Sequence, residues 1–288
     1  MSLINVKCNL CGADDYRVLY DSTVKDTSPS LEDCVSTINR YASFNRVVSC
    51  RSCGLVYANP RDAGLKRLYE QVVDDEYLES WHDRARTFRN HIRILESFKK
   101  EKGRLLDIGC YGGIFLDEAK KHGYDISGIE PSRWAAELAA GKTGARVVCG
   151  GWDDASLPSD HFDIVTIWDV IEHLEDPSAC LRQVQMWLKP GGIVAITTHD
   201  IGSLFARIMG KRYPWLMRFH LYHFEPKTLS AMLAKNGLET ISARYYVKTF
   251  SLKYILGRMG FSLRNILFEK VAIPLNSGDM FMMIARKK

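Results

Sequence analysis

The chain has 288 residues, of which 46% are hydrophobic, and its formal net charge is +5 at pH 7. This length and composition are sufficient for a full α/β core with additional segments. The charge is mild and there is no arginine-rich arm, which argues against a protein that binds nucleic acid through a basic surface. The N-terminus has no signal-peptide pattern, and no uncharged apolar run reaches roughly 18 residues. We therefore expect a cytoplasmic protein without a transmembrane segment.

Two Cys-x-x-Cys-Gly knuckles lie near the N-terminus, one from Cys8 to Cys11 and one from Cys50 to Cys53. This spacing lets both sulfurs of a knuckle face one point, and the glycine that follows relieves the tight turn. Four thiolates form the closed tetrahedral donor set of a structural Zn²⁺ site. We predict that these four cysteines bind zinc in a module spanning residues 1–62. The alternatives are ordinary buried thiols and a redox-active pair.

Residues 63–102 are expected to form a helical cover, because apolar side chains recur there at spacings of three and four residues. The two apolar stripes comprise Leu65, Leu68, Tyr69 and Val72, and Phe88, Ile92, Leu95 and Phe98. Aromatic side chains at this spacing belong either to the core or to the wall of a ligand site. Tyr69, Tyr77 and Trp81 are the candidates for the second role.

A strand, a glycine-rich turn and a helix follow between residues 104 and 116. The apolar run Leu105–Ile108 predicts the strand, and a helical pattern restarts after Gly113. This order is typical of the first βα unit of a doubly wound sheet, where nucleotide-like ligands bind at the carboxyl end of the strand. Gly109, Gly112 and Gly113 let the backbone approach a ligand closely. Their spacing differs from the G-x-G-x-x-G dinucleotide fingerprint, which argues against a NAD-dependent oxidoreductase.

Five motifs, in this order and spacing, resemble the motif series of class I S-adenosylmethionine-dependent methyltransferases. They are Asp107–Gly113, Gly128–Glu130, Phe162–Val165, Glu172–His173 and Leu188–Gly192. The resemblance covers about residues 103–200. It implies a Rossmann-like α/β fold with a seven-stranded sheet over residues 103–288, and S-adenosylmethionine as the cofactor. Tyr111 stands where the family usually has glycine, so we expect the turn to be re-formed there.

The resemblance also implies which residues contact the cofactor. They are Asp107, Gly109, Cys110, Tyr111, Gly113, Glu130, Trp152, Asp153 and Trp168. Glu130 ends a second short strand, where its carboxylate suits two ribose hydroxyls. Trp152 and Asp153 are placed on the adenine side, although the Gly-Gly and Asp-Asp pairs around them would also suit a solvated turn.

Methyl transfer to a hydroxyl or a carbon acid requires a base whose pKa lies near neutrality. His173 follows the predicted fourth strand and is a candidate, but in this family the Glu-His pair often serves packing instead. An aromatic-rich insertion over residues 201–226 contains His220, Tyr222 and His223, the densest group of titratable side chains in the chain. Each of these could simply pack or cap the following helix, yet we expect at least one to line the acceptor site. His199 is a further candidate.

A two-knuckle zinc module ahead of such a domain resembles bacterial enzymes that act on sugars, polysaccharides or secondary metabolites. We therefore expect a methyltransferase for a small molecule or glycan, with O-methylation favoured and C-methylation of a sugar next. A non-catalytic zinc-containing adaptor on the same scaffold and a nucleic-acid methyltransferase are the alternatives. No Asn-Pro-Pro-Tyr signature follows the fourth strand, which argues against the amino-methylating enzymes that use it.

The C-terminal part contains an amphipathic segment over residues 251–270, in which basic residues outnumber acidic ones. Such a segment either packs on its own domain or makes a peripheral contact with a membrane surface. Tyr245–Val247 and Met280–Ala285 are predicted to be the last two strands, paired as an antiparallel hairpin at the sheet edge.

Overall fold

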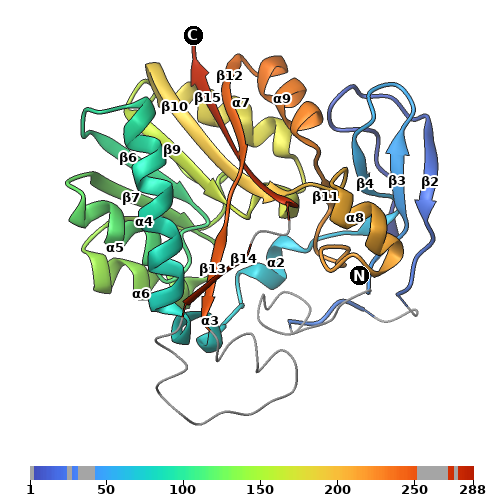
Figure 1. Ribbon diagram of the computed structural model, residues 1–288, viewed down its shortest axis with the longest axis horizontal. Coiled ribbons are helices and arrows are strands. Elements are labelled where there is room, and N and C mark those ends of the chain that lie inside the picture. The colour runs from blue at the N-terminus through green and yellow to red at the C-terminus, as the bar shows by residue number, and fades with distance from the viewer. Residues whose placement is uncertain (1–2, 25–27, 32–42, 252–271, 276–277) are drawn as a thin grey trace.

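The computed structural model describes residues 3–24, 28–31, 43–251, 272–275 and 278–288. Within these residues a seven-stranded sheet forms the centre of the molecule (Figure 1). Its strands are β6 (Arg104–Ile108), β7 (Asp125–Glu130), β8 (Arg146–Cys149), β9 (Phe162–Trp168), β10 (Leu188–His199), β12 (Leu238–Tyr245) and β15 (Met280–Lys287). The order is β12-β15-β10-β9-β6-β7-β8. In this order, the five strands β10, β9, β6, β7 and β8 are parallel to one another, and β15 is antiparallel to both of its neighbours.

Helices cover both faces of this sheet. One face carries α4 (Trp81–Phe98), α5 (Ile114–Lys121) and α6 (Arg133–Thr143), and the other carries α7 (Pro177–Trp187) and α9 (Pro226–Lys235). Alternate residues of β10 divide between the two cores: Ile193 and Ala195 pack toward α4–α6, and Val194 and Ile196 toward α7 and α9. A strand buried on both faces reads as a continuous apolar run, as this one does.

The strand order reverses between β6 and β9, because β7 and β8 extend the sheet on one side and β9 and β10 on the other. In open α/β sheets ligands bind at such a reversal, beyond the carboxyl ends of the strands. The helices that follow begin at local signals. Ser132 accepts a hydrogen bond from the Ala135 N–H at the start of α6, and Asp176 accepts one from the Ala179 N–H at the start of α7.

A second sheet of four strands joins two distant parts of the chain. Its strands are β2 (Tyr16–Tyr20), β3 (Val47–Cys50), β4 (Val56–Ala58) and β11 (Tyr222–His223), in the order β11-β4-β3-β2. Tyr222 lies opposite Tyr57 and His223 opposite Val56. The N-terminal segment and the insertion after β10 therefore share one sheet, and Figure 1 shows these strands beside helix α8 (Leu204–Met209).

The remaining elements are short. They are β1 (Leu3–Ile4) paired with β5 (Arg61–Asp62), β13 (Lys248–Ser251) paired with β14 (Ala272–Leu275), α2 (Lys66–Tyr69), α3 (Asp75–Glu79) and the 3-10 helices η1 (Ile171–His173) and η2 (Gly210–Arg212). Of the two apolar stripes predicted between residues 63 and 102, the second lies on α4. Only Leu68 and Tyr69 of the first lie within α2, because this helix comprises just four residues.

The predicted fold class is confirmed: the sheet has seven strands and the doubly wound α/β arrangement. The last two strands form the expected antiparallel pair, but β12 ends at Tyr245 instead of starting there. Helix α9 is followed at once by Gly237, whose φ of +75° turns the chain directly into β12.

The amphipathic segment lies outside the described residues except for Ser251, and the prediction of a membrane contact lies there with it. Among the described residues, no helix combines the length and the apolar character needed to cross a bilayer.

Candidate functional site

Near the end of β6, just before the glycine-rich turn, a buried carboxyl group lies toward the carboxyl edge of the sheet. Asp107 accepts a hydrogen bond of 2.7 Å from the Thr166 hydroxyl on β9. The pKa of Asp107 is raised to about 8, because burial and the nearby Glu130 raise it by more than the hydrogen bond from Thr166 lowers it. Gly109 follows with φ of +75°, and a Cβ there would come within 2.6 Å of the Val170 side chain. Only glycine fits at this position.

Glu130 ends β7 and binds the same turn. Its two carboxylate oxygens each accept a hydrogen bond of 2.8 Å, one from the Tyr111 N–H and one from the Ser132 N–H. Burial raises the pKa of Glu130 to about 7, although these two N–H groups act in the opposite direction. Each oxygen keeps a second lone pair, so the carboxylate can still accept hydrogen bonds from the hydroxyls of a ribose.

Tyr111 holds the turn in the conformation that glycine would normally provide. Its φ is +45°, in the left-handed region. Its hydroxyl accepts a hydrogen bond from the Asp74 N–H and donates one to the Asp74 carbonyl. Its ring lies 4.7 Å from that of Tyr77 and 6.0 Å from that of Trp134, measured between centroids. These contacts tie the turn to the segment before α4 and offset the backbone strain.

The other expected cofactor residues lie around this turn. Cys110 is buried, and its sulfur would be 2.7 Å from a Cβ at position 128, which explains why Gly128 is needed there. Gly113 has φ of +84° and immediately precedes α5. Trp168 ends β9 in an aromatic cluster, with ring centroids 4.8 Å from His91 and 5.1 Å from Phe115.

Trp152 and Asp153 follow β8 at the same edge of the sheet. Trp152 is partly buried against the core. Asp153 is exposed and accepts a hydrogen bond of 2.7 Å from the Lys66 ammonium group on α2. Lys66 also bonds Asp154, so it bridges the turn to the helical cover. The sequence pattern did not indicate this role of Lys66.

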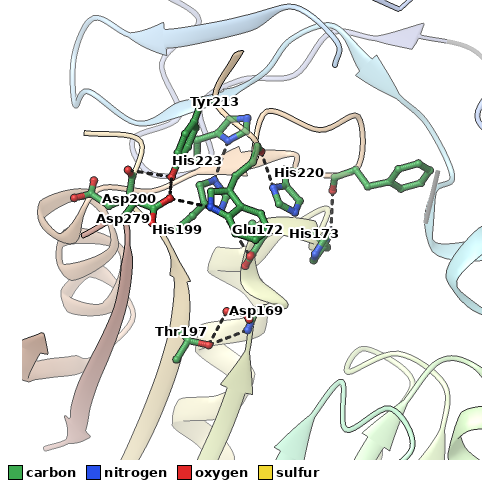
Figure 2. A network of polar contacts seen from close by, with 12 residues as sticks. Asp169, Glu172, His173, Thr197, His199, Asp200, Tyr213, His220, His223 and Asp279 are labelled. Atoms are coloured by element: carbon green, nitrogen blue, oxygen red, sulfur yellow. Dashed lines mark hydrogen bonds and ion pairs between the residues drawn. The ribbon is translucent and has the colours of Figure 1, made fainter. Parts of the chain in front are cut away.

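Beyond the ends of β9 and β10 lies a group of histidines (Figure 2). His173 Nδ1 is 3.0 Å from the Phe219 carbonyl and 2.8 Å from the Tyr69 hydroxyl, and His220 Nδ1 is 2.8 Å from the Trp215 carbonyl. A carbonyl only accepts, so the proton of each neutral ring is on Nδ1 and Nε2 carries the lone pair. Burial lowers the pKa of His173, and burial together with the nearby histidines holds that of His220 well below its usual range.

His199 and His223 extend this group toward the second sheet. His199 Nε2 and His223 Nδ1 are 3.0 Å apart, and both side chains are 1% exposed. His199 Nδ1 is 3.8 Å from Oε1 of Glu172, a buried carboxylate on η1. Burial, with His199 nearby, keeps the pKa of His223 well below its usual range. The lowered pKa values thus keep His173, His220 and His223 neutral, and the side chain of Glu172 lies beside this group.

Tyr222, the fourth expected catalytic residue, makes its hydrogen bonds outside the histidine group. Its hydroxyl accepts a hydrogen bond of 3.0 Å from Arg61 Nη1 and donates one of 3.2 Å to the Glu175 carbonyl. Burial raises its pKa, and Arg61 opposes the rise. The same guanidinium donates to the Glu175 carbonyl through Nη2, at 2.9 Å. Tyr222 thus links the N-terminal segment to the turn after η1.

A buried carboxylate that sequence reasoning missed anchors the insertion. Asp279 Oδ2 accepts hydrogen bonds from the Tyr213 hydroxyl at 3.0 Å and from the Trp215 indole N–H at 2.9 Å (Figure 2). The Asp200 N–H donates to the Asp279 carbonyl. The one sequence signal for Asp279 is its position directly before the last predicted strand. Nothing in the local sequence connects it to Tyr213, so its role could not be inferred there.

The two cysteine knuckles converge in the N-terminal segment. Cys8 Sγ is 3.4 Å from Cys53 Sγ, Cys11 Sγ is 3.5 Å from Cys50 Sγ, and all four sulfurs lie within 4.8 Å of one another. Sulfurs around a tetrahedral Zn²⁺ are about 3.8 Å apart for Zn–S bonds of about 2.3 Å, so this donor set fits zinc.

Both knuckles use the same turn. The Gly12 N–H bonds the Cys8 carbonyl at 2.8 Å and the Gly54 N–H bonds the Cys50 carbonyl at 3.0 Å, with φ near +80° at each glycine. Burial opposes ionisation of Cys50, but the N–H groups of Cys53 and Ser52 lower its pKa to about 7. At Cys8 and Cys53 burial has the larger effect, so the pKa of Cys8 is raised to about 11 and that of Cys53 further.

A family model described as "Methyltransferase domain" matches residues 80–243, more than half of the chain. The chain belongs to the class I S-adenosylmethionine-dependent methyltransferases. The matched range contains β6 to β10 and the histidines at their ends.

Two curated relatives of this methyltransferase carry the name ubiquinone biosynthesis O-methyltransferase. The one from Bordetella avium is 32% identical over 156 residues, which are 49% of this chain and 64% of that protein. The one from Thiobacillus denitrificans is 29% identical over 150 residues, which are 48% of this chain and 65% of that protein. The chain thus spans just under two thirds of the length of these relatives.

Among solved structures, the methyltransferase resembles a protein from Thermotoga maritima described as an S-adenosylmethionine-dependent methyltransferase and possible histamine N-methyltransferase. The TM-score is 0.52 and the identity 21%, over 78% of this chain and 98% of that one. At this identity the similarity concerns the fold alone.

Proposed function

We propose that this protein transfers the methyl group of S-adenosylmethionine to a hydroxyl oxygen of a small molecule. The observation that carries the proposal is that two groups of residues lie at one edge of the sheet. The first is the glycine-rich turn after β6 with Asp107 and Glu130 beside it, and the second is the neutral histidines His173 and His220 beyond β9 and β10. The names of the relatives from Bordetella avium and Thiobacillus denitrificans support oxygen as the acceptor atom.

The residues around the turn fit the cofactor. Glu130 ends β7 with free lone pairs for two ribose hydroxyls, and Asp107 supplies a second carboxyl group near it. Gly109 keeps the backbone free of side chains where the ligand would approach. When bound, S-adenosylmethionine supplies an electrophilic methyl group on a positively charged sulfur. The remaining tasks of the chain are to bind, to orient the acceptor and to accept a proton.

His220 and His173 suit the last task. Both present Nε2 as the basic atom, because a backbone carbonyl holds the proton on Nδ1. Because their pKa values are lowered, both are neutral at physiological pH and can accept a proton. The stronger lowering at His220 makes it the weaker base of the two. His223 and Tyr222 stay candidates for contact with the acceptor. A sugar or glycan hydroxyl is an acceptor of the same chemistry and belongs in the same screen.

The four cysteines are proposed to bind a structural Zn²⁺, since their sulfur distances match a closed thiolate site. We propose residues 1–62 as the zinc module, residues 63–102 as the helical cover and residues 103–288 as the methyltransferase domain, in which the insertion over residues 201–226 lines the acceptor side. The module would then support the acceptor side, because β4 pairs with β11 of that insertion.

Calorimetric titration of the purified protein with S-adenosylmethionine and S-adenosylhomocysteine is the first test. Micromolar binding of both, followed by methyl transfer to a phenolic or sugar hydroxyl in a screen of small molecules, is the expected result. Absence of binding by a folded protein would contradict the proposal and favour a non-catalytic adaptor. Methylation of RNA or DNA with a steep dependence on salt would favour a nucleic-acid enzyme instead.

A further inference from the structure

Helix α8 presents two large apolar side chains to solvent. Leu204 and Ile208 are each 74% exposed, the highest values among the large hydrophobic side chains of the described residues. They are four residues apart in one helix, so their side chains are neighbours on the same face. Single exposed apolar residues are common, but an adjacent pair on one helix face is a candidate contact surface.

The opposite side of α8 is anchored to the protein. Ala206 is buried and belongs to one hydrophobic cluster with Val47 and Val56 of the second sheet. Phe205 and Met209 pack partly against the same cluster. Figure 1 shows α8 beside this sheet, at the outside of the molecule. The two exposed residues therefore protrude from a helix that is held from behind.

The surroundings of the two apolar residues are basic. Arg207 shares their helix face, and Lys211 and Arg212 follow one turn later; all three side chains are exposed. No ion pair between described residues involves any of the three. Between Asp200 and Glu225 the sequence contains no acidic residue. The surface is thus apolar along the helix and positively charged beside it.

From this combination we infer that α8 docks onto a membrane surface that contains anionic lipids. The docking face consists of Leu204, Arg207, Ile208, Lys211 and Arg212. Its apolar pair enters the boundary between headgroups and acyl chains, and its basic side chains contact the lipid phosphates. The inference goes beyond the proposed function and does not rest on it, because binding to lipid needs neither the cofactor nor an acceptor.

The size and chemistry of the docking face favour lipid over a protein partner. A stable protein interface covers about 800 Å² on each side, and its core is enriched in aromatic residues. Helix α8 has six residues, which makes it only about 9 Å long, and its two protruding side chains are aliphatic. A bilayer requires no matching contour, and it accepts shallow insertion of a few apolar side chains flanked by cations.

The docking face lies close to the carboxyl edge of the central sheet. Helix α8 begins five residues after His199, the last residue of β10. Trp215, whose carbonyl accepts the hydrogen bond from His220, packs partly against the same cluster as Ala206. The docking face and the histidines are therefore parts of one segment of the chain, and docking brings this edge of the sheet toward the lipid surface.

The test is flotation of the full-length protein with lipid vesicles in a density gradient. We expect binding to vesicles of about two parts phosphatidylcholine and one part phosphatidylglycerol, with little binding to phosphatidylcholine alone or at high salt. Leu204→Ser combined with Ile208→Ser should weaken this binding at least about tenfold, because the inserted apolar area is removed. Met186→Ser is the matched control on α7, where the methionine is 49% exposed, and should leave binding unchanged.

A second double variant tests the charged part of the docking face. Arg207→Gln combined with Lys211→Gln should also weaken binding at least about tenfold, and the remaining binding should depend less on salt. Arg93→Gln combined with Lys100→Gln removes the same charge from exposed positions in and after α4. This control should keep vesicle affinity within about twofold, because the lost charges lie outside the docking face.

Three results would overturn the inference. The first is absence of binding to either vesicle by the unmodified protein. The second is binding that both docking-face variants retain in full, which would place the membrane contact elsewhere, for example at residues 251–270. The third is an assembly of two copies, detected by analytical ultracentrifugation, that Leu204→Ser with Ile208→Ser dissociates; it would assign this face to a dimer. Thermal unfolding should be unchanged in all variants, since the replaced side chains are exposed, and this would exclude loss of folding as the cause of weaker binding.

Discussion

Arg218 and Asp62 form a bidentate ion pair in the interior, with Arg218 Nε 2.7 Å from Asp62 Oδ2 and Nη2 2.8 Å from Oδ1. The Asn45 amide donates to the same carboxylate at 2.8 Å. Burial opposes ionisation of Asp62, but the guanidinium beside it and the Asn45 amide hold its pKa below the usual value. The pair joins the N-terminal segment to the insertion that carries His220.

Asp62→Ala should lower the free energy of unfolding by about 3–5 kcal/mol, because it leaves the Arg218 charge buried and uncompensated. Chemical denaturation of both proteins measures this difference. Lys288→Ala serves as control, since it removes an ion pair with Glu239 in which both side chains are exposed, and should cost no more than about 0.5 kcal/mol. A loss in Asp62→Ala no larger than that of the control would show that the pair contributes nothing to stability.

Glu130→Ala should weaken S-adenosylmethionine binding by roughly 1.5–3 kcal/mol, the scale of hydrogen bonds to a charged group. Titration calorimetry measures the change, and Glu137→Ala, on the exposed side of α6, should leave the affinity unaltered. Equal affinities for all three proteins would mean that the ribose does not bind at Glu130.

Cofactor affinity should rise with pH between about 6 and 9, because Glu130 and Asp107 must ionise to accept hydrogen bonds and their pKa values are raised to about 7 and about 8. The same shifts also affect the stability of the cofactor-free protein. Its free energy of unfolding is higher at low pH, where both carboxyl groups are protonated, and this contribution is lost as the pH rises through 7–8. Calorimetry in buffers of different ionisation enthalpy should detect proton release on binding below pH 7. An affinity that does not change between about pH 6 and pH 9 would contradict the assignment of Glu130 and Asp107 to the cofactor site.

Zinc should co-purify with the protein at about one ion per chain, and Cys50→Ser should remove it and lower the unfolding temperature. Metal content by elemental analysis and thermal unfolding measure the two effects. Cys149→Ser provides the matched control, because Cys149 is an exposed thiol outside the cluster. Zinc retained at full stoichiometry in Cys50→Ser would exclude a four-thiolate site.

His220→Asn and His173→Asn should lower kcat by roughly 100-fold or more while the affinity for S-adenosylmethionine stays within about twofold. The reason is that the proposed function assigns both side chains to the acceptor and the cofactor to the turn at Glu130. Steady-state kinetics with the acceptor found by screening, together with calorimetry, separate the two quantities. Normal turnover in either variant would remove that histidine from the reaction.

The fold could be predicted because its signals are local. A short apolar strand followed by a glycine turn identifies β6 and the start of α5, and the Leu-Lys-Pro-Gly-Gly turn marks β10. The fold class is confirmed, and the family is shown by the match over residues 80–243. The cofactor, catalytic and metal residues stay predictions, although the four cysteine sulfurs do converge.

The contacts that hold the insertion over residues 201–226 to the rest of the chain could not be predicted in the same way. Asp62 and Arg218 are 156 residues apart, and β11 is only two residues long, so neither has a periodic pattern around it. In the sequence, Asp279 is an ordinary residue before a strand. Its role becomes visible only in the structure, where Tyr213 and Trp215 donate hydrogen bonds to it. Long-range polar pairs are selected by tertiary packing, which a single sequence does not reveal.

The pairing of β11 with β4 has a practical consequence for dissecting the chain. A fragment that starts at residue 103 would leave the backbone of Tyr222 and His223 as an open edge, and would remove Tyr57 and Leu55 from the core that they share with α7 and α9. Open edges recruit other chains, so such a fragment should aggregate. Grafting of the insertion onto another methyltransferase must therefore transfer residues 3–62 along with it.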